Sequence, residues 1–231
     1  MKEQIKLICF DADDTLWVNE PYYREIEKRF SALMKEFIDE DACQEELLKI
    51  EINNIGLYGY GAKSFMLSMI ETALKISDHK INQSKIGQIL ELGNELINKP
   101  VELLDGVENV LKSLKDKYRL IVATKGDLLD QERKLDKSGL EQYFHHIEIM
   151  SEKEPANYKK LIAHLDIPVG QFLMVGNSVK SDILPVLEIG GHAIHIPCET
   201  TWAHEHVENH STSNPRFQKV NSISEITGLL L

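Results

Sequence analysis

Three carboxylates follow a short apolar segment near the start of the chain. The segment Ile5–Phe10 contains one charged residue, Lys6, and its length suits a strand that is buried on both faces of a parallel sheet. Asp11, Asp13 and Asp14 come directly after it, where an open α/β sheet binds its ligands. Because Asp11 and Asp13 are two residues apart, their side chains point the same way in an extended chain. Two like charges so close need a cation or a shared proton.

The same residues also suit a polar turn. Asp13-Asp14-Thr15 is typical of the residues that cap the N-terminus of a helix. The cluster by itself leaves both interpretations open, and the rest of the chain has to decide between them.

Further strands are expected after Pro100, each with polar residues at its end. Apolar runs predict strands near residues 118–123, 144–150, 171–175, 192–196 and 217–220, with helices near 107–115 and 128–138 between them. Three of these strands are followed by Thr124-Lys125, by Lys153 and by the segment Gly176–Asp182. A hydroxyl and a backbone N–H at a strand tip are what a phosphoryl oxygen requires.

Residues 19–100 have a different pattern. Apolar residues at helical spacing predict helices near 21–37, 45–52, 64–76 and 83–97, and no strand is expected there. A helical block inserted after the first strand is typical of a lid that excludes water and selects substrate. We therefore expect a core of residues 1–18 and 101–231 and an inserted helical domain over residues 19–100.

A glycine-rich stretch, Gly56–Ser64, lies inside this helical block. It approaches a phosphate-binding P-loop, but Ala62 separates Gly61 from Lys63 and no strand precedes it. We expect a mobile loop between two helices, from which Tyr60 and Lys63 face the cleft and bind substrate.

Composition limits the class of protein. The 231 residues are 42% hydrophobic and carry a formal net charge of −11, which argues against non-specific binding to nucleic acid or to an anionic membrane. The three cysteines are far apart in the sequence, so we expect no disulfide framework. We expect the protein to be located in a reducing cytoplasm. No signal peptide or membrane span is expected, and the chain is expected to act as a monomer or a homodimer.

Four short motifs share a place at the end of a strand, and they come in this order: Asp11-x-Asp13-x-Thr15, Thr124, Lys153 and Gly176-Asn177-x-x-x-x-Asp182. Together they resemble the motifs of the haloacid dehalogenase-like (HAD) hydrolases, in the subgroup with a helical cap between the first two motifs. The resemblance covers the whole chain and implies an α/β fold with a doubly wound, Rossmann-like parallel sheet and an inserted helical cap domain. Asp14 and Asn177 depart from it, because many members have glycine and aspartate at these positions.

The resemblance also implies a function, which is Mg²⁺-dependent hydrolysis of a small phosphomonoester through an aspartyl-phosphate. Asp11 would be the nucleophile and Asp13 the general acid and base. Thr124 and Lys153 would stabilise the phosphoryl oxygens, and Lys125 would also bind substrate.

The same resemblance implies a metal site. Mg²⁺ would be held by the Asp11 carboxylate, the Asp13 backbone carbonyl and Asp182. The Asn177 amide oxygen can bind Mg²⁺ directly or through water, but it brings no charge.

Three rival functions stay open on the same fold. A 2-haloacid dehalogenase needs neither Mg²⁺ nor the second aspartate, so Asp13 argues against it. A phosphosugar mutase would keep all four motifs, and a non-catalytic phosphate-binding regulator would be compatible with Asn177. The substrate itself is not identified by the sequence.

Histidines near the C-terminus suggest a second metal site. His206 and His210 are four residues apart and could share a helix face as zinc ligands. Glu208 stands where the H-E-x-x-H motif has its second histidine, so we expect surface histidines instead.

Overall fold

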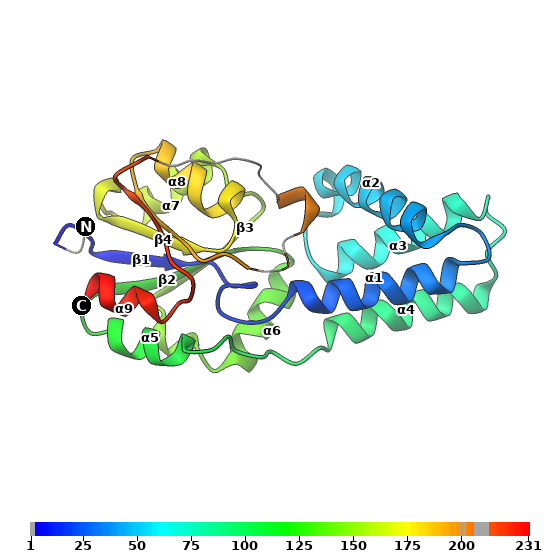
Figure 1. The fold of residues 1–231 in the computed structure, drawn as a ribbon, viewed down its shortest axis with the longest axis horizontal. Helices are drawn as coiled ribbons and strands as arrows, with labels where there is room; N and C mark the ends of the chain where they lie inside the picture. Colours follow the sequence, from blue (N-terminus) through cyan, green and yellow to red (C-terminus); the bar gives the residue numbers. More distant parts are fainter. Residues whose placement is uncertain (1–2, 199, 201, 206–212) are drawn as a thin grey trace. The chain divides into compact units, whose positions relative to one another are not determined.

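The described residues form six strands, which make one parallel sheet. The strands are β1 (Leu7–Phe10), β2 (Arg119–Lys125), β3 (His146–Met150), β4 (Phe172–Gly176), β5 (His192–His195) and β6 (Phe217–Lys219). Their order is β3-β2-β1-β4-β5-β6, so β1 lies between β2 and β4 (Figure 1). The winding direction reverses between β1 and β4, and ligands of α/β proteins bind beyond the carboxyl ends of the strands at such a point. The sequence-based prediction of a doubly wound α/β core is confirmed.

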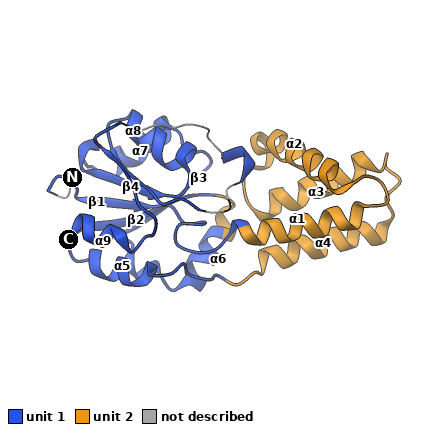
Figure 2. Cartoon of the chain, in the orientation of Figure 1, with its two compact units in different colours: residues 1–20, 101–125, 131–231 blue, residues 21–100, 126–130 orange. Residues whose placement is uncertain are grey.

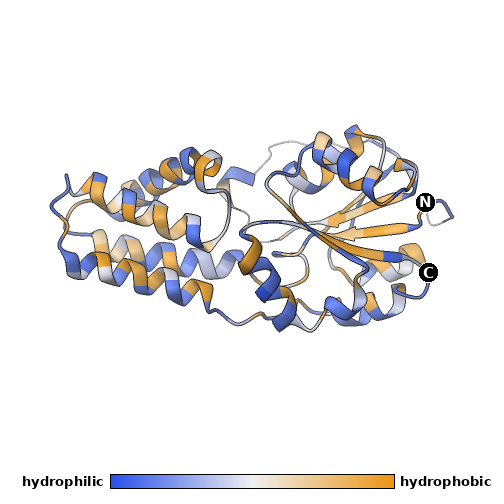
Figure 3. Cartoon of the chain, turned by 180° about the vertical axis from the view of Figure 1, so that it is seen from behind, coloured by the Kyte–Doolittle hydropathy of each residue, from blue (hydrophilic) through white to orange (hydrophobic). Residues whose placement is uncertain are grey.

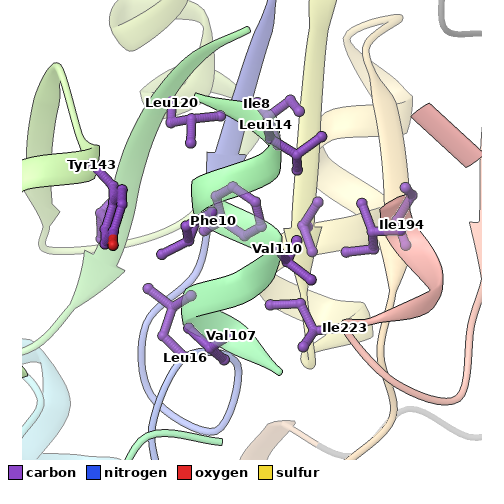
Figure 4. Packing of buried hydrophobic residues seen from close by; sticks show 14 of the residues in the cluster. Ile8, Phe10, Leu16, Val107, Val110, Leu114, Leu120, Tyr143, Ile194 and Ile223 are labelled. Atoms are coloured by element: carbon purple, nitrogen blue, oxygen red, sulfur yellow. The ribbon is translucent and has the colours of Figure 1, made fainter. Parts of the chain in front are cut away.

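Helices cover both faces of the sheet. They are α5 (Val107–Leu114), α6 (Leu128–Ser138), α7 (Pro155–His164), α8 (Leu184–Glu188) and α9 (Glu225–Leu230). Alternate residues of β1 point to opposite faces, so Ile8 and Phe10 pack in one core with residues of α5 and α9 (Figure 4). Leu7 and Cys9 pack in the other core, with residues of α7 and α8. Burial on both faces holds β1 in place just before the acidic residues.

Shorter helical turns complete this part of the chain. Among the described residues, three of them are 3-10 helices, namely Glu141–Tyr143, Val169–Gln171 and Ala203–Glu205, and one is a π-helical turn, Val179–Ile183. The π-helical turn leads directly into α8, so it carries the fourth motif from the end of β4 into a helix.

The structure is a computed structural model that describes residues 3–198, 200, 202–205 and 213–231, and it divides into two units (Figure 2). Unit 1 contains the sheet and comprises residues 1–20, 101–125 and 131–231. Unit 2 is helical and comprises residues 21–100 and 126–130. The short segment 126–130, which follows the second motif, thus groups with the helices and not with the sheet.

Unit 2 is built from four helices with apolar inner faces. They are α1 (Glu20–Met34), α2 (Glu40–Tyr58), α3 (Ala62–Ile76) and α4 (Gln83–Ile97). Hydrophobic and hydrophilic residues alternate along these helices (Figure 3), whereas β1 and β4 of unit 1 contain no polar side chain. Phe30, Leu47, Met69 and Ile89 represent the four helices in the buried core of this unit. None of the described helices is long and apolar enough to span a membrane.

The predicted loop Gly56–Ser64 is wrong at both ends. Helix α2 continues through Tyr58, and α3 begins at Ala62. Gly59 has a φ of 72° and ends α2, because this backbone conformation is open to glycine. The start of α2 was also expected too late, since Asp39 accepts a hydrogen bond from the Ala42 N–H and caps the helix.

Strand β2 is longer than predicted. Thr124 and Lys125 were expected after the strand but belong to it, because β3 pairs with β2 as far as Lys125, opposite Met150. The second motif therefore lies on ordered strand backbone and not in a turn.

Candidate active site

Asp11 lies at the carboxyl end of the central strand. Its N–H donates to the Val175 carbonyl at 2.9 Å, which continues the ladder between β1 and β4. Its side chain accepts hydrogen bonds from Lys153 Nζ at 2.5 Å and from Thr15 Oγ1 at 3.0 Å. Burial raises the pKa of Asp11 to about 7; Lys153 opposes this shift and the charge of Asp182 adds to it. Asp11 is thus a buried carboxyl whose ionised form is held by one ammonium and one hydroxyl.

Lys153 joins Asp11 to the fourth motif. Its Nζ also donates to Asp182 Oδ1 at 2.7 Å, and the Lys153 and Asp182 side chains are almost fully buried. Burial disfavours the charge on Lys153, but the two carboxylates outweigh burial and raise its pKa. We call Asp11, Lys153 and Asp182 the nucleophile cluster, after the role that the sequence resemblance implies for Asp11. It contains two acids and one base, so it is one positive charge short of neutrality when all three groups are ionised.

The position of Asp182 depends on the turn that precedes it. The Ser178 N–H donates to Asp182 Oδ2 at 3.0 Å, and Ser178 Oγ accepts from the Ser181 N–H at 3.0 Å. A Cβ at Gly176 would come within 2.2 Å of Asp182 Oδ2, far inside normal contact. Glycine at this point of the fourth motif is therefore required by the carboxylate that it accommodates.

Asp13 binds a different set of partners from Asp11. Trp17 Nε1 and Lys134 Nζ donate to Asp13 Oδ1 at 2.7 and 2.9 Å, and Gln131 Nε2 donates to Oδ2 at 2.8 Å. Burial raises the pKa of Asp13, but Lys134 and the three hydrogen bonds outweigh it and lower the pKa overall. The expectation that the two carboxylates point the same way is wrong, because β1 ends at Phe10 and strand alternation does not extend through the turn.

Asp14 takes the capping role that the sequence left open. Its φ is 58°, a left-handed conformation that aspartate tolerates better than most residues. Its carboxylate accepts the N–H groups of Asn19 and Glu20 at 2.9 Å, at the start of α1. Burial raises the pKa of Asp14 to about 7, although these two N–H groups oppose the shift. The cap and the buried cluster are thus supplied by different carboxylates of the same turn.

The residues present fit a magnesium ion by their chemistry. Asp11 and Asp182 offer carboxylate oxygens, and their shared excess of negative charge suits a divalent cation. No N–H or O–H among the described residues donates to the Asp13 carbonyl, so that oxygen is available. Asn177 Oδ1 lies 3.4 Å from Thr15 Oγ1, which itself binds Asp11.

Of the four groups that could bind the metal, only Asp11 and Asp182 contribute acidic side chains; the other two are the Asp13 backbone carbonyl and the Asn177 amide. In agreement, no group of three or more His, Cys, Asp or Glu side chains suited to a metal occurs among the described residues. His206 and His210, which were considered for zinc, lie outside the described residues.

Thr124 and Lys125 have different surroundings although they are neighbours. Thr124 is buried near the end of β2, two residues beyond Val122, which pairs with Phe10 of β1. It therefore lies beside the turn that begins at Asp11. Lys125 Nζ instead donates to Ser181 Oγ at 3.0 Å and to Glu205 Oε1 at 2.5 Å.

Glu205 completes a second buried group of polar side chains. Its carboxylate accepts from both serine hydroxyls of the fourth motif, with Ser181 Oγ at 2.7 Å. Burial raises the pKa of Glu205, but Lys125 and the serine hydroxyls outweigh it and lower the pKa to about 2. We call Lys125, Glu205, Ser178 and Ser181 the bridge cluster. It contains one acid and one base, so its charges are matched.

The two residues proposed for substrate binding in the helical block both lie in unit 2. Lys63 Nζ pairs with Asp127 Oδ1 at 2.8 Å, and Asp127 also caps α6 by accepting the Asp130 N–H. Tyr60 lies between Gly59 and Gly61, in the short connection from α2 to α3. Substrate binding by Tyr60 and Lys63 stays a prediction.

Several partners in the site were missed from the sequence. Gln131 and Lys134 carried a signal, because residues three apart on a helix share a face and α6 follows the second motif directly. Glu205 carried none, since it lies 80 residues from Lys125 in the chain and follows no strand directly.

Comparison with known proteins identifies the family of the chain. A family model for haloacid dehalogenase-like hydrolases matches residues 5–190. A haloacid dehalogenase-like family hydrolase from Xanthomonas campestris is 37% identical, with a TM-score of 0.89 over 98% of this chain and 91% of its own. No curated protein matches the chain.

More distant structures share the fold only. A predicted phosphoglycolate phosphatase from Haemophilus somnus is 18% identical, with a TM-score of 0.64 over 99% of both chains. L-2-haloacid dehalogenase from Xanthobacter autotrophicus is 13% identical, with a TM-score of 0.68 over 98% of both chains. The family match and the Xanthomonas structure, together with four motifs gathered at the ends of adjacent strands, identify the chain as a member of the haloacid dehalogenase-like hydrolases.

Proposed function

We propose that this hydrolase is a Mg²⁺-dependent phosphatase that acts on a small phosphomonoester. The observation that carries the proposal is the nucleophile cluster, in which Lys153 binds both the buried Asp11 carboxylate at the end of β1 and the Asp182 carboxylate. Asp13, two residues after Asp11, is a further carboxylate, and its surroundings favour the ionised form. Two carboxylates in distinct surroundings suit a nucleophile and a proton carrier.

The proposed reaction has two steps. An Asp11 oxygen attacks phosphorus and the ester P–O bond breaks, so the phosphoryl group passes to Asp11 and the leaving alkoxide takes a proton from Asp13. Water then attacks the phosphorus of the aspartyl-phosphate and gives up a proton to Asp13, which frees phosphate and restores Asp11. Lys153 and Thr124 stabilise the charge on the transferring oxygens.

Asp13 is better prepared for the second step than for the first. Lys134, Gln131 and Trp17 favour its ionised form, which can accept a proton from water. As an acid it must first bind a proton against this preference. An ester with a good leaving group needs little protonation, so it is the substrate for which this preference matters least.

The metal is proposed from the charge of the cluster. Asp11, the Asp13 carbonyl and Asp182 would hold Mg²⁺, with Asn177 as a neutral fourth donor. When bound, Mg²⁺ neutralises charge on the phosphoryl oxygens. Activity should disappear when a chelator is added and return with excess Mg²⁺.

Dehalogenation is the alternative that the same fold accommodates. A panel of phosphorylated metabolites and 2-haloacids, assayed in parallel for phosphate and halide release with and without Mg²⁺, separates the two reactions. We expect phosphate release that depends on Mg²⁺ and no halide release. Halide release in excess chelator, without phosphate release, would contradict the proposal.

We propose for the helical unit the role of a lid that selects substrate. On the same panel, Lys63→Met should change the order of preferred substrates more than the turnover of a generic phosphoester. An equal loss on every substrate would indicate a role in folding instead. A small-molecule partner and a cytoplasmic location belong to the same proposal, and the three free cysteines suit a reducing compartment.

A further inference from the structure

Glu205 gathers donors from two separate parts of the sheet. Its Oε1 accepts from Lys125 Nζ at 2.5 Å and from Ser181 Oγ at 3.0 Å, and its Oε2 accepts from Ser181 Oγ at 2.7 Å and from Ser178 Oγ. Lys125 ends β2, whereas Ser178 and Ser181 follow β4. One carboxylate thus ties together the ends of two strands.

These two strands are not neighbours in the sheet. Strand β1 lies between β2 and β4, and adjacent strands are about 4.8 Å apart, so the two ends are separated by roughly 10 Å. Lys125 extends across this distance and reaches Ser181 Oγ at 3.0 Å. The bridge cluster therefore crosses the carboxyl end of β1, where Asp11 begins the acidic turn.

Each end of the bridge leads to an acid of the site. On the β4 side, Ser178 donates its N–H to Asp182, which binds Lys153. On the β2 side, the Lys125 carbonyl accepts from Gln131 Nε2, which also donates to Asp13. A shift of the bridge would thus move Asp182 and the partner of Asp13 together.

The charge and burial of the Glu205–Lys125 pair favour a persistent ion pair over a transient one. The Glu205 and Lys125 side chains are only 12% and 14% exposed, so water screens the pair little. Two serine hydroxyls fill further acceptor sites of the carboxylate, which makes the network well satisfied. None of these contacts with Glu205 involves a residue that takes part in the two proposed reaction steps.

We propose that Glu205 is a positioning residue of the active site, which fixes Lys125 and the Ser178–Ser181 turn across the end of β1 and thereby orients Asp182. On this view Lys125 anchors the bridge and is not a ligand of the substrate. The kinetic part of the test rests on the proposed phosphatase function, and the exchange part does not.

The kinetic test compares Glu205→Gln with wild type on p-nitrophenyl phosphate in the presence of Mg²⁺. Because a small misplacement of catalytic groups slows the reaction strongly, kcat should fall by about tenfold or more. KM should stay within about threefold, since Glu205 does not touch substrate. Glu205→Asp, which keeps the charge, should recover part of kcat.

Lys180→Met is the matched control. Lys180 lies in the π-helical turn Val179–Ile183 and contacts His204, the neighbour of Glu205 in the 3-10 helix Ala203–Glu205, at 3.0 Å. The Lys180 side chain forms no hydrogen bond with the side chains of the bridge cluster in the described contacts, so its loss should leave kcat and KM unchanged. Wild-type kcat in Glu205→Gln would overturn the proposal. So would a lower KM in that variant, because Glu205 would then compete with a substrate anion.

Hydrogen exchange tests the same idea without activity. The Ser181 and Asp182 N–H groups are held by Ser178 Oγ and the Ser178 carbonyl, and in Glu205→Gln they should exchange at least about tenfold faster. The Asp11 N–H, held by Val175, should not change. If wild type releases no phosphate, the proposed function fails and this exchange result still decides. If Glu205→Gln does not fold, Ser181→Ala replaces it in both measurements, and unchanged kcat and exchange would overturn the proposal.

Discussion

Two buried polar clusters meet at the ends of β1, β2 and β4, and they differ in charge. The nucleophile cluster has two acids for one base, and the pKa of Asp11 is raised to about 7. The bridge cluster has one acid for one base with two hydroxyls, and the pKa of Glu205 is lowered to about 2. An unmatched cluster suits binding of a cation and reaction at a carboxylate, whereas a matched one suits a fixed support. In the proposed mechanism, this difference in charge separates the groups that react from the groups that hold them in position.

Replacing Asp11 should have the largest effect. Asp11→Asn removes the attacking oxygen while keeping the shape of the side chain, so turnover should fall by at least ~10⁴-fold. Because the pKa of Asp11 is raised from 3.8 to about 7, stability falls as the pH rises between these two values, and the full cost of the buried charge is present above that range. At pH 8 the variant should therefore have a free energy of unfolding equal to or above wild type. Turnover and urea unfolding check both points, and an active Asp11→Asn would remove the distinction between the clusters.

Replacing Lys153 should make the charge mismatch worse. Lys153→Met leaves Asp11 and Asp182 buried without their shared ammonium, which should lower the free energy of unfolding by about 3–5 kcal/mol. Mg²⁺ should restore more stability to this variant than to wild type. Urea unfolding with and without Mg²⁺ measures both, and Lys134→Met is the control at the neighbouring acid. Equal responses to Mg²⁺ would indicate that the cluster does not bind it.

Gly176→Ala tests whether the position of Asp182 matters. The added Cβ would come within 2.2 Å of Asp182 Oδ2, and both oxygens of that carboxylate are tethered, so stability should fall by about 3 kcal/mol. Gly228→Ala is a matched control, because nothing lies within 4 Å of the Cβ added there. Thermal unfolding of the two variants should differ clearly. Similar values would show that the fourth motif adapts easily.

The contribution of the bridge cluster to the free energy of unfolding should be lost at acidic pH. The pKa of Glu205 is lowered from its ordinary value of 4.5 to about 2, so its charge stabilises the fold fully above pH 4.5 and this contribution is lost as the pH falls toward 2. The advantage of wild type over Glu205→Gln in urea unfolding should therefore shrink by about 2 kcal/mol between pH 5 and pH 3. An advantage that does not depend on pH would mean that the charge of Glu205 is not what holds the bridge.

The nucleophile cluster was predictable because each member follows a strand that the sequence predicts. Parallel strands bring their carboxyl ends to one edge of the sheet, so Asp11, Lys153 and Asp182 meet there although they are far apart in the chain. The direction of Asp13 was not predictable, since it depends on a tight turn and on Trp17, Gln131 and Lys134. Side-chain alternation holds only while the backbone stays extended.

The bridge cluster was not predictable from local pattern. Lys125 resembles a substrate ligand at a strand tip until Glu205 is found beside it, and the 3-10 helix that carries Glu205 has no apolar period. The glycines at positions 56, 59 and 61 led to a predicted loop that is longer than the one in the structure. Gly56 tolerates a helix, and only Gly59 and Gly61 have the positive φ values that end one helix before the next begins.

Trapping the covalent intermediate tests the central claim most directly. Asp13→Asn keeps the Asp11 nucleophile but removes the group that activates water, so its second step should slow by about 10²–10⁴-fold. With an ester that has a good leaving group, one burst of alcohol should precede slow turnover, and phosphate should be found on Asp11 by mass spectrometry of the quenched protein. Phosphate on another residue, or a burst that survives in Asp11→Asn, would contradict the assignment of Asp11 as the nucleophile.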